Sequence, residues 1–156
     1  MKTPLRRIVL IGENIELRIV SLVVRCREVA EDVVVFDTGS TDETVQLAGE
    51  VQSRVVEYNG DPTPQHLAKA AVSASLDDGL TLFLPISPMW KMAELPLSVN
   101  RAREGWDIHY LYREQPGTNA LEPMMLANAS MGHLIASAAG LQHLAQLPDD
   151  ATTDDV

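Results

Sequence analysis

The sequence predicts an α/β fold with a mainly parallel sheet and helices on both faces, a three-layer sandwich. Three observations support this prediction. Four short apolar runs rich in valine, isoleucine or leucine have the length of strands. The segments between them repeat apolar residues at helical spacing, so strand and helix alternate along the chain. This alternation favours right-handed crossovers and parallel strands.

The elements follow in order along the chain. The expected strands are residues 7–11 (RIVLI), 33–36 (VVVF), 54–58 (RVVEY) and 80–84 (LTLFL). Cys26 continues the apolar stripe of the first helix, so we expect a small buried core residue rather than a reactive thiol. The later pattern predicts a short helix over 94–103, a strand over 106–113 and one amphipathic helix over 130–146.

Length and composition set the limits. With 156 residues, 46% of them apolar, residues 1–147 are expected to form one α/β domain, and the acidic tail 148–156 is expected to be disordered. The net charge of -10 disfavours nucleic acid and anionic membranes as partners. No apolar run has the length of a membrane span or signal peptide, so we expect a cytoplasmic protein. The single cysteine excludes an internal disulfide.

The stretch "VVVFDTGSTDET" contains the candidate site. Asp37 ends an expected strand, where ligands bind in an open parallel sheet. Gly39 allows a tight turn, and Ser40 with Glu43 is expected to form a capping box for the next helix, whose first amides would point towards a ligand. Such a turn suits a ribose, a base or a phosphate. The alternative is a well-capped helix and nothing more.

The longer string "DVVVFDTGSTDETVQLAGEVQSRVVEYNG" resembles the nucleotide-binding segment of family 2 glycosyltransferases. The resemblance covers residues 7–90 and implies a GT-A-type, Rossmann-like domain that binds a nucleotide or nucleotide sugar. It implies that Asp37 contacts the base or ribose, and that Gly39, Ser40 and Asp42 shape the pocket. The family usually has a Pro-x-Tyr-Asn-like loop after the first strand, and here the shortened loop in "LIGENIEL" replaces it with Gly12, Glu13 and Asn14.

Two departures from the family concern the chemistry. Where the family has an Asp-x-Asp motif, this chain has Pro85 and Ser87. Carboxylates there would hold the cation that neutralises a diphosphate leaving group. We therefore expect no metal site and no divalent metal cofactor, and leave open whether the chain is an enzyme. The acceptor half is shortened to residues 91–147, and its acids do not lie in an assignable motif: Asp107, Glu114 and Glu122.

The other candidates are weaker. His66, with Gln65 and Lys69, is a candidate to face a phosphate by resemblance, and a solvated helix face is the alternative. Three histidines lack partners at ligand or triad spacing and are expected to be structural: His109, His133 and His143. Trp90 and Trp106 are expected to close the core rather than to stack on a base.

Three functions stay open. The leading hypothesis is a nucleotide-sugar-binding domain that is metal-independent and impaired or inactive as a transferase, a binding or regulatory relative of a full-length enzyme, with a homo-oligomer or a partner subunit possible. The second is an active metal-independent transferase in which arginines replace the cation: Arg101, Arg103 and Arg113. The third is a non-enzymatic α/β protein-interaction module. A dinucleotide-binding site is disfavoured because the chain has no G-x-G-x-x-G motif. A receiver domain is disfavoured because the chain lacks the acids that such a domain needs after its first strand and at the end of its third.

Overall fold

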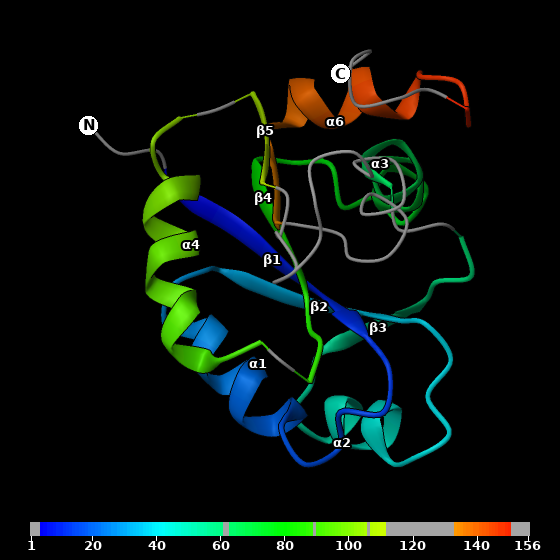
Figure 1. Cartoon of the computed structure of the whole chain (residues 1–156), viewed down its shortest axis with the longest axis vertical. Helices are drawn as coiled ribbons and strands as arrows, with labels where there is room; N and C mark the ends of the chain where they lie inside the picture. The colour runs from blue at the N-terminus through cyan, green and yellow to red at the C-terminus, as the bar shows by residue number, and fades with distance from the viewer. Residues whose placement is uncertain (1–3, 61–62, 89, 106, 112–132, 151–156) are drawn as a thin grey trace, which may run out of the picture.

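The computed structural model describes residues 4–60, 63–88, 90–105, 107–111 and 133–150. These residues form one six-stranded sheet with helices on both faces (Figure 1). The strands are β1 (Leu5–Gly12), β2 (Asp32–Asp37), β3 (Arg54–Glu57), β4 (Leu80–Pro85), β5 (Ile108–Leu111) and β6 (His133–Ala136). The helices are α1 (Ile19–Arg27), α2 (Thr44–Glu50), α3 (Pro64–Ser73), η1 (Met92–Glu94, a 3-10 turn), α4 (Leu95–Ala102) and α6 (Ala138–Ala145).

The strand order is β3-β2-β1-β4-β6-β5. The first four strands are parallel, whereas β6 is antiparallel to both β4 and β5. The predicted α/β fold with a mainly parallel sheet is therefore confirmed. Because β1, β2 and β4 are parallel and in register, Gly12, Asp37 and Pro85 end at the same edge of the sheet.

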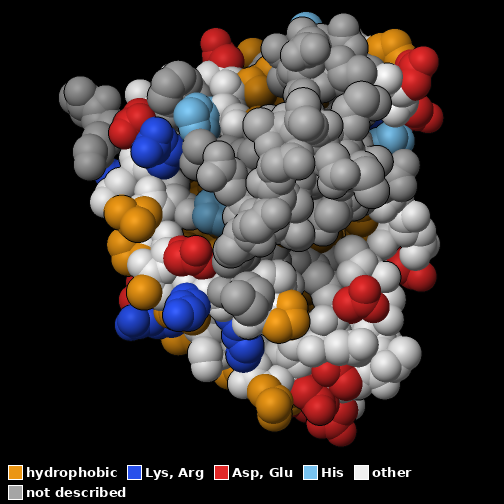
Figure 2. All heavy atoms as spheres, in the orientation of Figure 1, with side chains coloured by type: hydrophobic (Ala, Val, Ile, Leu, Met, Phe, Trp, Pro, Cys, Tyr) orange, Lys and Arg blue, Asp and Glu red, His pale blue; other side chains and the backbone are white. Residues whose placement is uncertain are grey.

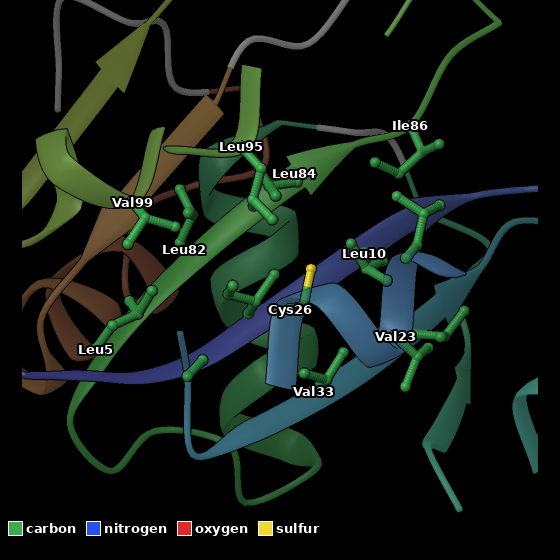
Figure 3. Close-up of a cluster of buried hydrophobic side chains, with 14 of the residues drawn as sticks. Leu5, Leu10, Val23, Cys26, Val33, Leu82, Leu84, Ile86, Leu95 and Val99 are labelled. Atoms are coloured by element: carbon green, nitrogen blue, oxygen red, sulfur yellow. The ribbon is translucent and has the colours of Figure 1, made fainter. Parts of the chain in front are cut away.

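Side chains of the central strands alternate between two apolar layers, because successive residues of a strand point to opposite faces. In β1, Ile8 and Leu10 pack with α1 and α4, and Val9 and Ile11 pack with α3 and α6. Cys26 is fully buried in the first layer (Figure 3). Burial raises the pKa of its thiol to about 12, so the expectation of an inert core cysteine holds.

The prediction of one helix over 130–146 is wrong. Within the described part of that range, residues 133–136 form β6, and α6 starts after Ser137, whose hydroxyl accepts a hydrogen bond from the Gly140 amide. Leu134 pairs with Phe83 of β4, completing a sheet edge that would otherwise lack a partner. This non-local pairing outweighs the helical spacing of the apolar residues, and it places His133 on a strand.

The predicted helix over 94–103 is confirmed by α4, and β5 lies within the predicted strand 106–113. The expected disorder of 148–156 is untested: 148–150 are described and 151–156 lie outside the described residues. Among the described residues, no helix has both the length and the apolar character needed to cross a bilayer.

Candidate functional site

The candidate site lies at the edge of the sheet where β1, β2 and β4 have their carboxyl ends. The strands stay paired to this edge: the Thr38 amide donates to the Gly12 carbonyl at 3.1 Å, and the Ile86 amide donates to Ile11 at 2.7 Å. A side chain at Gly12 would place its Cβ 3.0 Å from the Ile86 carbonyl oxygen. Glycine at this position allows the two backbones to approach closely, and a side chain would require the backbone at Ile86 to shift by a few tenths of an ångström.

Asp37 organises the turn that follows β2. Its Oδ2 accepts hydrogen bonds from the amides of Gly39 at 3.3 Å and Ser40 at 3.1 Å, and its Oδ1 accepts one from the Ser40 hydroxyl. Gly39 has φ +124°, a conformation that side chains disfavour. Asp37 is only 7% exposed. A carboxylate has about four acceptor positions, so the three bonds of the turn leave room for one more donor on Asp37.

The loop before α1 is joined to this turn through Asn14. The side-chain Oδ1 of Asn14 accepts a hydrogen bond from the Thr41 backbone amide at 2.8 Å, and the backbone amide of Asn14 donates to the Ser40 hydroxyl at 3.0 Å. Asn14 has φ 53°, a left-handed conformation that asparagine tolerates better than most residues. The two loops that would line a ligand are thus held together by side chains 26 and 27 positions apart in sequence.

Asp42 joins the same two loops and binds the first residue of α2. It accepts from the Thr44 amide at 2.9 Å, the Thr44 hydroxyl at 2.5 Å and the Glu16 amide at 3.3 Å. Desolvation works against the charged carboxylate, but these hydrogen bonds outweigh it and lower the pKa of Asp42. The expected capping box of Ser40 with Glu43 is wrong, because α2 begins at Thr44 and Ser40 is engaged by Asp37 and Asn14.

Two amides at the start of α2 are engaged by acidic side chains and not directed at a ligand. Asp42 takes the Thr44 amide, and the carboxylate of Glu16 takes the Glu43 amide at 3.1 Å. Acidic side chains gather at the foot of the molecule, over α2 and the loops beside it (Figure 2). This acidic part of the edge disfavours an anion.

The loop after β4 is fastened by Arg18, which sequence reasoning missed. Its guanidinium donates to the carbonyl oxygens of Ser87 at 3.2 Å and Trp90 at 2.6 Å, and lies 5.8 Å from the centre of the Trp90 ring. Trp90 is 2% exposed, which agrees with the expected role in closing the core. The only signal for Arg18 in the sequence was a basic residue just before an apolar helix.

His66 lies in the first turn of α3, on the face of the sheet that α3 and α6 cover. Its Nδ1 is 2.5 Å from the Thr63 hydroxyl, and its Nε2 is 3.5 Å from Asp149. The structure thus brings Gly12, Asp37, Gly39, Ser40 and Asp42 together, and groups His66 with the segment after α6 instead.

The arginines considered as substitutes for a cation are not grouped with the turn. Arg103 follows α4 and lines an open groove of about 500 Å³ with Leu5, Arg27 and Glu31, at the opposite edge of the sheet. Arg101 lies two residues earlier, in the last turn of α4, and Arg113 lies outside the described residues. The described arginines therefore do not support the hypothesis of a cation-replacing cluster.

Sequence reasoning also missed the contact of Ser98 with His133. The Ser98 hydroxyl, on α4, is 2.6 Å from His133 Nδ1, and Ser98 is 5% exposed. His133 begins β6, beside the carboxyl end of β4, because its neighbour Leu134 pairs with Phe83. Only the sheet pairing brings the two residues together, so no spacing in the sequence could have indicated the pair.

Comparison with known proteins identifies the fold. No protein-family model and no curated protein matches the sequence. The structure is similar to glucosyl-3-phosphoglycerate synthase from Mycobacterium tuberculosis with Mn2+ and UDP-glucose, at 20% identity and a TM-score of 0.54. It is also similar to mannosyl-3-phosphoglycerate synthase from Rubrobacter xylanophilus, at 14% identity and a TM-score of 0.55. The fold is that of GT-A-type glycosyltransferases.

The GT-A-type similarity covers most of this chain but a smaller part of each synthase. The alignments include 85% and 86% of this chain, and 56% and 54% of the two synthases. The chain therefore spans little more than half of their length. The resemblance read from the sequence is confirmed at the level of the fold.

The expectation of no divalent metal cofactor is corrected by these comparisons. The mycobacterial synthase has been solved with Mn2+ together with UDP-glucose, and also with Mn2+ and UDP. Such cations are often held by one or two carboxylates plus phosphate oxygens of the substrate. The replacement of the Asp-x-Asp carboxylates therefore does not exclude a metal in a protein of this fold.

The described residues at the end of β4 do not themselves fit a cation site. Pro85 has no side-chain ligand, Ser87 has only a neutral hydroxyl, and the Ser87 carbonyl is engaged by Arg18. Within the described ranges, no group of three or more His, Cys, Asp or Glu residues could hold a metal ion.

Proposed function

We propose that this chain is a nucleotide-sugar-binding domain of the GT-A type, which binds a uridine diphosphate sugar or a similar nucleotide at the carboxyl edge of its sheet. The proposed contacts at the turn are Gly12, Asp37, Gly39, Ser40 and Asp42. His66 on α3, which contacts Asp149 rather than the turn, is a separate proposed contact. The GT-A-type fold supports this proposal, as does the presence of UDP and UDP-glucose in solved structures of that fold.

The observation that carries the proposal is that the Asp37 carboxylate is held in place and can still accept a hydrogen bond. The turn and the joined loops hold its carboxylate in one position, and one acceptor position stays available at a 7% exposed group. A fixed acceptor of this kind suits a ribose hydroxyl or a base N–H, because a hydrogen bond to an ionised group contributes about 1.5–3 kcal/mol. The exposed Gly39 leaves the adjoining backbone open to a ligand.

We propose binding, rather than efficient sugar transfer, as the role of this chain. Transfer needs groups that stabilise the charge of the leaving diphosphate. At the end of β4, Pro85 and Ser87 do not supply such a charge, and Arg18 is committed to the backbone of that loop. The chain would then act as a binding or regulatory relative of a full-length transferase.

The test is calorimetric titration of the protein with UDP, UDP-glucose and ADP, each in the presence of Mn2+. We expect saturable binding of both uridine nucleotides at one site, and weaker binding of ADP. Absence of heat with all three ligands would reject the proposal and leave the protein-interaction module as the working hypothesis. Efficient release of glucose onto an added acceptor would contradict the restriction to binding.

A further inference from the structure

The segment after α6 returns to the same edge of the sheet as the candidate site. Because β6 is antiparallel to β4 and α6 turns back over the sheet, α6 ends where the parallel strands have their carboxyl ends. The helix α3 follows the parallel strand β3 and so begins at that edge. Helices α3 and α6 pack against each other, and Figure 1 shows the chain after α6 beside α3.

Asp149 of this segment lies against polar and basic side chains of α3. Its carboxylate forms an ion pair with Lys69 Nζ and lies 3.5 Å from His66 Nε2. The Gln65 side chain donates to the Asp149 carbonyl at 3.3 Å, and Thr63 contacts the other ring nitrogen of His66. We call Gln65, His66 and Lys69 the α3 cluster. The contacts of the α3 cluster with Asp149 are made by side chains and not by backbone amides of the helix.

The α3 cluster is preformed. Gln65 is only 2% exposed, and the contact of Thr63 with Nδ1 fixes the ring of His66 so that Nε2 faces Asp149. The chain has 22 acidic and 12 basic residues, so most of its surface repels an anion. The lysine and histidine of the α3 cluster attract one instead. The hydrogen bond and the charge of Lys69 lower the pKa of Asp149, so the carboxylate is ionised at neutral pH.

Asp149 is nevertheless easy to replace. Its side chain is 73% exposed, and exposed ion pairs contribute about 0–1 kcal/mol. A phosphate group has more negative charge and more acceptor oxygens than a carboxylate, and it forms strong charge-assisted hydrogen bonds with basic side chains. A phosphate-bearing ligand therefore has the chemistry to displace Asp149 from the α3 cluster.

We propose that the α3 cluster is a binding site for phosphate groups, that Asp149 is its intramolecular occupant, and that ligand binding displaces the segment after α6. This inference rests on the proposed function for the identity of the natural ligand, a nucleoside diphosphate or its sugar. The site itself depends only on the residues of α3 and Asp149. Release of Asp149 would make the position of this segment respond to the ligand.

The test is titration of the full chain with pyrophosphate and with UDP, using the variants Asp149→Asn and Asp150→Asn. Both variants remove one negative charge from the same segment, but only Asp149 contacts the α3 cluster. We expect Asp149→Asn to bind both ligands about two- to fivefold more tightly, and Asp150→Asn to bind like the wild type. Equal tightening in the two variants would reduce the effect to net charge and overturn the inference.

A double-mutant cycle tests the direct competition. Lys69→Met should weaken pyrophosphate binding, and Asp149→Asn should bring no further gain when Lys69 is absent. Unchanged affinity in Asp149→Asn, or no pyrophosphate binding by either protein, would overturn the inference while leaving UDP binding at the Asp37 turn intact. Conversely, pyrophosphate binding that tightens in Asp149→Asn, together with UDP binding no tighter than pyrophosphate binding, would support the α3 cluster as a phosphate site and reject the proposed function.

Discussion

At the scale of single residues, Asp37 combines a structural role with a candidate role as a ligand contact, and the sequence could not separate the two. Its carboxylate accepts three hydrogen bonds from the turn it belongs to, and its carbonyl accepts the amide of Tyr58 at 2.8 Å. The residue is therefore a structural cap for the turn. Because one acceptor position remains, the same residue also stays a candidate ligand contact, and a substitution will affect both stability and binding.

We predict that Asp37→Asn lowers the free energy of unfolding by about 1–3 kcal/mol, because the amide nitrogen would face donors where a carboxylate oxygen accepted them. Urea denaturation measures this loss. UDP affinity should fall in the same variant. The matched control is Glu57→Gln, since Glu57 is exposed and lies opposite Asp37 on β3. If both variants keep the wild-type stability, the carboxylate does not hold the turn.

At the scale of elements, several junctions depend on backbones that approach closely. Helix α6 begins against the start of β5: the amide of Ser137 donates to the Asp107 carbonyl at 2.9 Å, and Gly140 lies directly over the same carbonyl. A Cβ at Gly140 would lie 1.9 Å from the Asp107 carbonyl oxygen. The junction of α6 with the sheet therefore requires a glycine at this position.

Gly140→Ala should destabilise the protein by about 1–3 kcal/mol or more, because the backbone of β5 or α6 must shift to admit a methyl group. Thermal denaturation checks the prediction. Gly49→Ala is the matched control, a helical glycine with open space around its Cα. That control is expected to be neutral or stabilising by up to about 1 kcal/mol, since alanine favours a helix. Equal melting temperatures for the two variants would contradict the close approach at Gly140.

At the scale of the whole molecule, the edge opposite the candidate site is held by the buried Arg7. This residue is 2% exposed, and its guanidinium donates to Asp32 at 3.0 Å, to Asp78 at 2.5 Å and to the Leu76 carbonyl at 2.9 Å. These bonds join β1, β2 and the loop before β4. Removing one partner of such a network leaves a buried charge with fewer compensating contacts.

The network predicts a specific loss of stability in acid. Hydrogen bonds from Arg7, and then from Arg6, lower the pKa of Asp78 to about 2. Since this value is below that of an unfolded aspartate, near 4, the contribution of Asp78 is fully present above about pH 4. It is lost as the pH falls towards 2. The wild type should therefore lose stability more steeply over this interval than Asp78→Asn, measured by urea denaturation at each pH.

Asp77→Asn is the control for this comparison, because Asp77 contacts Gln142 and not the arginines of β1. It should follow the wild-type pH dependence. Parallel curves for the wild type and Asp78→Asn would show that the bond with Arg7 does not shift the titration of this carboxyl in the folded protein.

The sequence by itself determined the central part of this protein. The apolar runs of β1 to β4, the stripes of the helices between them and the turn at Asp37 and Gly39 could all be read from neighbouring residues. These features are local: a strand needs a short apolar run, and a positive φ at a strand end favours glycine. The resemblance to GT-A-type glycosyltransferases depended on the same local string, which is why the fold was predicted.

Only the tertiary structure decided how the candidate site is assembled. The bond of Asn14 with Thr41, the pairing of Leu134 with Phe83 and the contact of Lys69 with Asp149 join residues far apart in the sequence. Helical spacing around residue 134 predicted a helix, because the spacing of apolar residues reports only on neighbours in the sequence. It carries no information about the strand β4, whose edge is stabilised by pairing with β6. The contacts of Asn14 and Glu16 with the turn, and of Asp149 with α3, are long-range contacts of this kind, and they exist only once the sheet has formed.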